Sequence, residues 1–240
     1  MDRPSLALSG VVFRTPAGPL DAGTRTLVGP GLVGVVGSTG SGKSTLLRCL
    51  AGLHPAARGR LVAGLRPPRR HLLLQPPEWQ LVGATVADAV GAGAGPALER
   101  LGVAHLASQA PYRLSTGERR RVALASLLQS DAPLVLLDEP TAGVDGAGAR
   151  LTYEILSELA ATRLVVVASH DWAWLMHAVG RVWWVDGLRV AADGTPAELA
   201  QRLTAGPELF DVVQALRAER LPGTCWWDAE QLAREVLAAW

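Results

Sequence analysis

The fold of this chain is decided by the stretch Gly37-Ser38-Thr39-Gly40-Ser41-Gly42-Lys43-Ser44, which matches the pattern G-x-x-x-x-G-K-[ST] in full. The apolar run Leu32–Val36 precedes it, and leucines recur after it at helical spacing. This order predicts a strand, a glycine-rich loop and a helix. Glycines let a backbone curl around a polyphosphate, and a helix N-terminus offers free N–H groups to an anion. The stretch therefore predicts a nucleotide triphosphate site.

The loop and the first helical turn supply the expected contacts to ATP. We expect Lys43 to reach the β- and γ-phosphates and Ser44 to bind Mg²⁺. The ATP-binding residues predicted on this ground are Gly37, Ser38, Thr39, Gly40, Ser41, Gly42, Lys43, Ser44 and Thr45. A chance glycine-rich turn is the alternative, and the strand and helix expected on either side argue against it.

Two further apolar runs end in polar side chains. Leu134–Leu137 is followed by Asp138 and Glu139, and Leu164–Ala168 is followed shortly by His170. Ligands bind at the carboxyl edge of a parallel sheet. We expect Asp138 to hold Mg²⁺ and Glu139 to polarise the attacking water as general base. His170 is a candidate for contact with the γ-phosphate, whereas a solvated strand end is the alternative for the acids.

Strands and helices are expected to alternate along the chain, which predicts an α/β fold with a largely parallel sheet. Further expected strands are Leu72–Leu74 and Val182–Val185, and the expected helices include Arg119–Leu128 and Arg150–Ala160. Residues 88–111 are rich in alanine and glycine, and we interpret them as a small, mostly helical insert. The stretch from about Pro196 reads as helices.

Composition excludes few partners. The chain has 240 residues with 23 basic and 22 acidic side chains, so its net charge of +1 gives no support for a nucleic-acid partner. No apolar stretch reaches the ~20 residues that span a bilayer, and the N-terminus lacks the pattern of a signal peptide. Cys49 and Cys225 have no metal-ligand spacing, which favours a reduced, cytosolic protein.

A family resemblance enters just before the acidic strand. Leu114-Ser115-Thr116-Gly117-Glu118 resembles the signature motif of ATP-binding cassette (ABC) proteins, which usually reads Leu-Ser-Gly-Gly-Gln. The phosphate-binding loop, the acids and His170 occur in the family's order, with Gln75 at the Q-loop position and Asp145 at the D-loop position. The resemblance covers roughly residues 5–200.

The resemblance implies a fold and a division of the chain. The fold is an α/β P-loop NTPase with a mainly parallel core sheet, a small N-terminal antiparallel β portion and a short helical subdomain. The ABC ATPase domain is expected at 1–200, with its helical insert at about 76–128. Residues 201–240 are expected to form a C-terminal helical extension.

The function implied by the resemblance is that of the ATP-binding and ATP-hydrolysing subunit of an ABC membrane transporter, with ATP and Mg²⁺ as cofactors. Each ATP is expected to lie between one subunit's phosphate-binding loop and a second subunit's signature, so that ATP drives dimer closure. The implied residues are Glu139, His170 and Gln75 for catalysis, Ser44, Gln75 and Asp138 for the metal, Ser115, Thr116, Gly117 and Glu118 for the signature, and Asp145 for the D-loop. The implied partners are a second ABC ATPase subunit, identical or different, and integral membrane subunits, with the chain peripheral on the cytoplasmic face of the cell membrane.

The segment from Gln75 to Val90 is similar to that of the energy-coupling factor importers, which take up vitamins and metal ions. Gln75, Gln80, Leu81 and Thr85 match that family's spacing or nearly so. Other importer ATPases can carry a similar segment. Trp79 lies here too, where an aromatic side chain could anchor a partner helix or simply pack.

Three departures from the family pattern bear on the site. Thr116 stands where glycine is usual, so its Cβ could narrow the approach of phosphate, and Glu118 brings a negative charge in place of glutamine. The aromatic residue that commonly stacks on adenine is missing. Phe13 is expected in the core, and Arg14 could stack its planar guanidinium on the base.

Two other classes of protein are alternatives to the transporter. A soluble ABC ATPase acting on ribosomes or DNA is the first, but the chain has one cassette and no heptad run or basic tail. A nucleotide kinase is the second, and the signature segment argues against it.

Overall fold

The computed structural model describes residues 5–63, 70–75, 80–170, 174–175, 178–196 and 198–199. The predicted extension at 201–240 lies outside these residues, as do Trp79 and Cys225. Within the described part, nine strands form one sheet in the order β4-β1-β2-β9-β8-β3-β7-β6-β5. Domain boundaries at residues 76, 128 and 200 stay predictions.

Parallel strands form the core of the sheet, as the alternation of strands and helices predicted. They are β3 (Gly31–Val36), β5 (Arg70–Leu73), β6 (Leu134–Asp138), β7 (Leu164–Ala168) and β8 (Arg181–Asp186). Every residue of β6 and β7 is buried, because helices or other strands cover both faces of a parallel sheet. The strand expected at Leu72–Leu74 begins two residues earlier and ends at Leu73.

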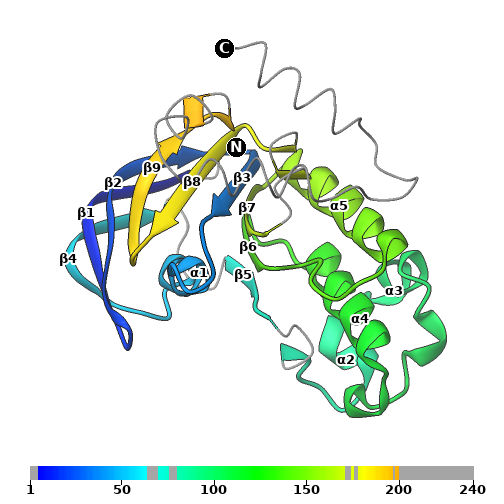
Figure 1. The fold of residues 1–240 in the computed structure, drawn as a ribbon. Helices are drawn as coiled ribbons and strands as arrows, with labels where there is room; N and C mark the ends of the chain where they lie inside the picture. Colours follow the sequence, from blue (N-terminus) through cyan, green and yellow to red (C-terminus); the bar gives the residue numbers. More distant parts are fainter. Residues whose placement is uncertain are drawn as a thin grey trace, which may run out of the picture.

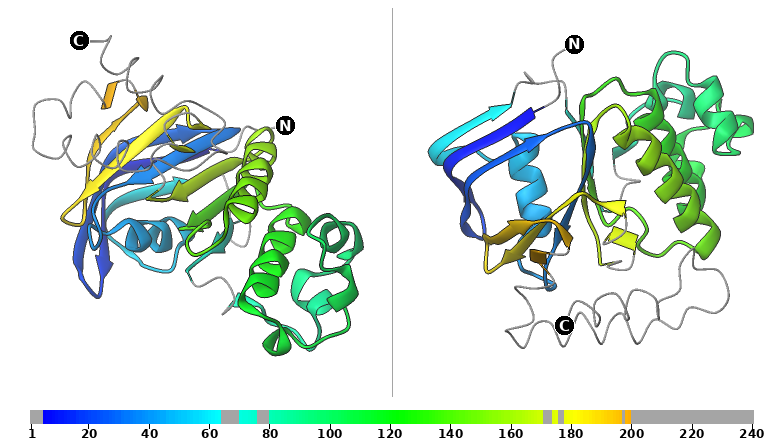
Figure 2. Two further views of the ribbon diagram at one scale, coloured as in Figure 1. Left: turned by 45° about the vertical axis from the view of Figure 1, so that its right-hand side comes forward. Right: turned by 90° about the horizontal axis from the view of Figure 1, so that it is seen from above.

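The predicted antiparallel portion is confirmed. It contains β1 (Ser5–Thr15), β2 (Gly18–Val28) and β4 (Ala56–Ala63), and β9 (Arg189–Gly194) joins it to the core by pairing antiparallel with β8. This portion curves around α1 (Lys43–Ala51), as Figures 1 and 2 show. Leu46, Leu47 and Leu50 of α1 share one buried cluster with Phe13 and Leu20 of the antiparallel strands. The prediction that Phe13 belongs to the core is therefore confirmed.

The opposite face of the core sheet carries α5 (Gly146–Ala160) and the helical insert (Figure 1). The described part of the insert contains α2 (Val86–Val90), α3 (Gly95–Arg100), the 3₁₀ turns Ala104–Leu106 and Pro111–Arg113, and α4 (Thr116–Gln129). It lies beyond the β5 edge of the sheet (Figures 1 and 2). An ion pair between Arg100 and Glu158 ties α3 to α5 at 2.5 Å. The mostly helical insert predicted for residues 88–111 is confirmed.

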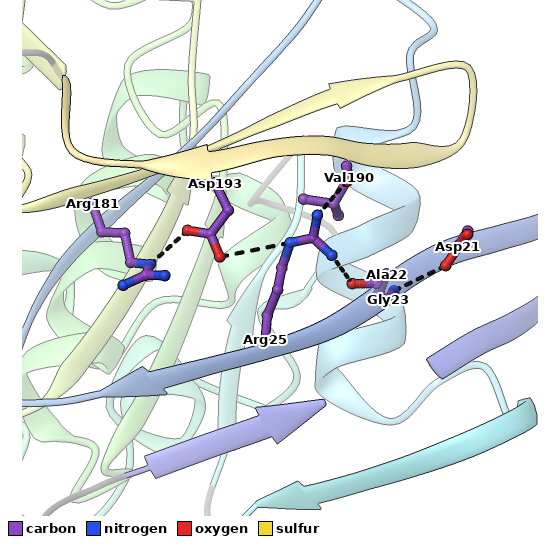
Figure 3. A network of polar contacts seen from close by, with 7 residues as sticks. All are labelled: Asp21, Ala22, Gly23, Arg25, Arg181, Val190 and Asp193. Carbon is purple, nitrogen blue, oxygen red and sulfur yellow. Dashed lines mark hydrogen bonds and ion pairs between the residues drawn. The ribbon is translucent and has the colours of Figure 1, made fainter. Parts of the chain in front are cut away.

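The joint between the antiparallel portion and the core is narrow. β2 and β9 share a single parallel pair, Asp21 with Arg189. The Arg25 guanidinium closes the rest of this junction by donating to the carbonyl oxygens of Ala22 and Val190 (Figure 3). Asp193 lies between two arginines, with its carboxylate 3.6 Å from Arg25 Nε and 2.6 Å from Arg181 Nε. Hydrogen bonds and ion pairs of the Arg25 side chain thus connect β2 to β9 where the two strands, both described in full, make no further backbone pairs.

Replacing Arg25 with methionine should destabilise the fold by about 3 kcal/mol, because it removes the donor of the two carbonyl oxygens on β2 and β9 and leaves the largely buried Asp193 carboxylate with one arginine, Arg181, instead of two. The midpoint of urea unfolding measures the loss. Arg150→Met is the matched control, since its ion pair with Glu154 is 59% and 50% exposed and exposed pairs contribute at most about 1 kcal/mol. Equal shifts for the two variants would contradict the role given to Arg25.

Candidate functional site

The phosphate-binding loop connects β3 to α1 and depends on its glycines. Gly37, Gly40 and Gly42 have φ values of 150°, 80° and 112°, a region that favours glycine. A Cβ on Gly37 would lie 2.1 Å from the carbonyl oxygen of Val185, and one on Gly42 would lie 2.9 Å from Leu188 Cδ2. The β8 backbone therefore requires glycine at position 37, and the φ of 112° favours glycine at position 42.

The β8–β9 hairpin is a part of the site that sequence reasoning missed. The Leu188 N–H donates to the carbonyl oxygen of Ser41 at 2.9 Å, and its own carbonyl accepts from the Asp21 N–H at 2.9 Å. Leu188 has a φ of 60°, which is rare for a branched side chain. Nothing in the sequence Asp186-Gly187-Leu188 indicates contact with a loop far away in the chain.

Lys43 is held over the loop. Its Nζ donates to the carbonyl oxygens of Gly37 at 2.9 Å and Ser38 at 3.0 Å, and the residue is only 6% exposed. Burial lowers the pKa of Lys43, while the nearby carboxylates of Glu139 and Asp138 act in the opposite direction. A buried cation bonded only to carbonyls can exchange them for phosphate oxygens, which make stronger, charge-assisted bonds.

The N-terminus of α1 is open to an anion. Gly42 is its N-cap residue and provides no side-chain cap, and α1, which is described in full, has no acidic residue in its first turn. Ser44 and Thr45 lie in this turn and are partly buried. Free N–H groups and the helix dipole together favour phosphate here.

Asp138 has the surroundings expected of a metal ligand. It ends β6, is 6% exposed, and its Oδ1 has no hydrogen-bond partner among the described residues. Burial raises the pKa of Asp138, while a hydrogen bond from the Ser44 side chain acts in the opposite direction. A buried carboxylate oxygen with spare capacity, beside a hydroxyl, fits Mg²⁺, which binds one or two protein oxygens and completes its shell with water and phosphate. The described residues hold no group of three or more His, Cys, Asp or Glu that could bind a metal alone.

Glu139 and His170 form a pair. Glu139 Oε1 lies 3.1 Å from the ring nitrogen Nε2 of His170. Glu139 Oε2 accepts a hydrogen bond from the backbone N–H of His170 at 3.1 Å. Burial, followed by the charge of Lys43, lowers the pKa of His170, so its imidazole is neutral at pH 7. Glu139 has a φ of 48°, a strained conformation that persists only where surrounding contacts impose it. Such a pair can hold a carboxylate in position to accept a proton from water.

Gln75 lies level with Glu139. β5 and β6 are parallel with Leu73 opposite Leu137, so Gln75 follows the end of β5 at the sheet edge where Glu139 follows the end of β6. Gln75 is exposed. The structure therefore brings the end of β5 to the same edge as the phosphate-binding loop and the two acids, and the metal-sensing role of Gln75 stays a prediction.

Arg14 is exposed on β1, between two buried neighbours. The Thr15 hydroxyl donates to the carbonyl oxygen of Gly18 at 2.6 Å, which ties it into the β1–β2 turn. Among Phe13, Arg14 and Thr15, only Arg14 has a side chain directed to solvent. Its contact with adenine stays a prediction.

The signature segment caps α4. Ser115 is the N-cap, and its backbone N–H and hydroxyl bond the Glu118 carboxylate at 2.8 and 2.7 Å, while the Glu118 N–H donates back to Ser115 Oγ at 3.3 Å. Hydrogen bonds from Ser115 lower the pKa of Glu118, which is therefore ionised. The helix begins at Thr116, earlier than expected, so Thr116 takes a helical conformation that does not require glycine. A Cβ on Gly117 would meet nothing within 4 Å.

One chain does not bring its signature to its own phosphate-binding loop. Figures 1 and 2 show α4 and the helical insert on the other side of β5 from α1. Asp145, at the D-loop position, is the N-cap of α5 and accepts from the Gly148 N–H at 2.7 Å. In the described part of the chain, no helix is long and apolar enough to span a bilayer.

Comparison with known proteins gives a consistent result. The family model described as "ABC transporter" matches residues 26–142. The chain is 40% identical over 191 residues to the zinc import ATP-binding protein ZnuC of Paracoccus denitrificans, covering 75% of this chain and 73% of that protein. It is 36% identical over 197 residues to the energy-coupling factor transporter ATP-binding protein EcfA2 of Symbiobacterium thermophilum, covering 70% and 68%.

Among solved structures, the chain is similar to cbiO1 from Clostridium perfringens, described as part of the ABC transporter complex cbiONQ. The TM-score is 0.68 at 23% identity, over 87% of this chain and 98% of that one. This likeness shows the fold. Together with the relatives, it shows that the chain belongs to the ATP-binding proteins of ABC transporters, which are ATPases coupled to transport.

Proposed function

We propose that this chain is the ATP-hydrolysing subunit of an importer of the energy-coupling factor type, and that ATP and Mg²⁺ close it onto a second ATPase subunit. The observation that carries the proposal is the gathering of Lys43, Asp138, Glu139 and His170 at one edge of the sheet, with the signature on a different part of the surface. A complete site then requires the signature of a second subunit. The second subunit can be identical or different.

The order of events follows from the described contacts. The triphosphate replaces the Gly37 and Ser38 carbonyls as the partner of Lys43 and takes the open N-terminus of α1. Ser44 and Asp138 would hold the Mg²⁺, which neutralises phosphate charge when bound. Glu139, oriented by His170, accepts a proton from the attacking water.

The proposal also names the partners of the chain and its place in the cell. The similarity of the Gln75–Val90 segment to energy-coupling factor importers, together with the names of two relatives that import zinc or belong to such a transporter, favours import. Integral membrane subunits on the cytoplasmic face of the cell membrane would be the partners. The same relatives favour a transporter over a soluble ABC ATPase on ribosomes or DNA.

Replacing Glu139 with glutamine should retain ATP binding and lower the hydrolysis rate by about 10²-fold or more, because the proton acceptor is lost. The variant should accumulate as a closed dimer in ATP and Mg²⁺, visible by size-exclusion chromatography with light scattering. Glu154→Gln, on the exposed side of α5, is the control. Hydrolysis at the normal rate in Glu139→Gln would overturn the role of Glu139.

Replacing Glu118 with glutamine should favour closure. Glutamine can keep the cap on α4, but it removes a negative charge beside Ser115, where the γ-phosphate of the partner's ATP would approach. In a Glu139→Gln background, the ATP concentration for half-maximal dimerisation should fall by roughly two- to fivefold. Glu99→Gln removes an exposed charge elsewhere in the insert and should change nothing. An unchanged or higher ATP requirement for Glu118→Gln would show that this carboxylate does not face phosphate.

A further inference from the structure

Glu139 and His170 each lie just beyond the end of a strand, Glu139 after β6 and His170 after β7. Their pairing therefore depends on the conformation of the chain outside the sheet. The backbone N–H of Glu139 donates to the Ala168 carbonyl oxygen at 2.8 Å. Glu139 itself has the strained positive φ described above. His170 leaves the sheet on the neighbouring strand β7. Beyond these points, other contacts must fix where the carboxylate and the imidazole lie.

The loop after Glu139 is held by α5. Thr141, two residues further on, accepts a hydrogen bond at 3.3 Å from the hydroxyl of Tyr153, which lies on α5. The Ala142 N–H donates to the Glu139 carbonyl oxygen at 3.2 Å, so the turn between them is closed. A shift of Tyr153 would therefore reach Glu139 through a short, hydrogen-bonded stretch of backbone.

Trp174, which follows His170 in the chain, contacts the same tyrosine. Trp174, four residues on, stacks its ring on that of Tyr153, with centroids 4.1 Å apart and planes 10° from parallel. Trp174 is 6% exposed, and its neighbour Leu175 is fully buried. Leu175 also packs against β3, since a Cβ on Gly34 would lie 3.4 Å from its Cδ2. Trp174 and Leu175 are thus held against both α5 and the strand that leads into the phosphate-binding loop.

We propose that Tyr153 and Trp174 are positioning residues for hydrolysis: their stack joins the Glu139 loop to the His170 segment and sets the geometry of the Glu139–His170 pair. The proposal rests on the proposed function, which makes this pair catalytic. Tyr153 contacts the Glu139 loop through its hydroxyl, and Trp174 is the first described residue that follows His170 in the chain.

This arrangement predicts a specific kinetic effect. A misplacement of about 1 Å in a reacting group can lower a rate about 10²-fold, whereas ATP binding depends on Lys43 and the loop. Loss of the stack should therefore lower kcat and leave the ATP dissociation constant unchanged. Buried residues that serve only the core would instead alter stability.

The test uses Trp174→Leu, Trp174→Phe and Tyr153→Phe in the full-length chain, with its partner subunits where hydrolysis requires them. We expect Trp174→Leu to lower kcat at least tenfold at unchanged ATP affinity, measured by titration with labelled ATP. Trp174→Phe keeps an aromatic face and should recover most of the rate. Tyr153→Phe keeps the stack but loses the bond to Thr141, and kcat should fall severalfold.

Leu159→Ala is the matched control. Leu159 lies on α5, is 4% exposed and belongs to the same buried cluster as Trp174, but it is near the far end of the helix. It should lower the thermal midpoint without changing kcat at temperatures where the protein is folded. If Trp174→Leu behaved like Leu159→Ala, or lost ATP affinity in proportion to rate, the inference would be overturned.

The two proposals can fail separately. Normal hydrolysis in Glu139→Gln would overturn the catalytic role of Glu139 in the proposed function, and this inference with it. An inactive Glu139→Gln beside a fully active Trp174→Leu and Tyr153→Phe would overturn the positioning role alone.

Discussion

The site depends on the parallel ladder that joins β3, β7, β6 and β5. Val35 pairs with Ala168, Ala168 with Asp138, and Leu137 with Leu73, so the strands run in register to a common carboxyl edge. Backbone hydrogen bonds fix this register, and a slip of one residue would turn every buried side chain to the wrong face. The loop, the acids, His170 and Gln75 are brought together because they follow directly where these strands end.

The ladder sets where the loops leave the carboxyl ends of the strands. Contacts from other elements set the conformation of those loops. The β8–β9 hairpin supports the phosphate-binding loop through Leu188, and α5 reaches both the Glu139 loop and the segment after His170. These supports come from distant parts of the sequence. Because strained and polar groups need several such supports to hold one geometry, the site is a property of the whole core.

The separation of the signature from the phosphate-binding loop supports the proposed closure of two subunits on ATP. Ser115 is capped by Glu118 in the single chain, so α4 is stable without nucleotide. The loop likewise satisfies Lys43 with its own carbonyls. Ser115 and Lys43 thus each have partners within the single chain, and in the proposed mechanism ATP would bridge the loop of one subunit and the signature of the other. Small free-energy differences allow a ligand to shift an equilibrium between open and closed states.

Residue type and spacing were enough to predict most of the core elements and the nucleotide-binding motifs. Continuous apolar runs such as Leu134–Leu137 and Leu164–Ala168 predicted buried parallel strands, and the glycine pattern from Gly37 to Gly42 predicted the loop, because burial and backbone freedom are local demands written in residue type. The capping pattern at Ser115 and Glu118 is local too, although the start of α4 at Thr116 differed from the expected helix. Only the tertiary structure decided that Leu188 contacts Ser41, that Arg25 closes the β2–β9 joint, and that Tyr153 and Trp174 stack. Those contacts join residues far apart in the chain, and no local spacing records which distant side chains meet when the sheet closes.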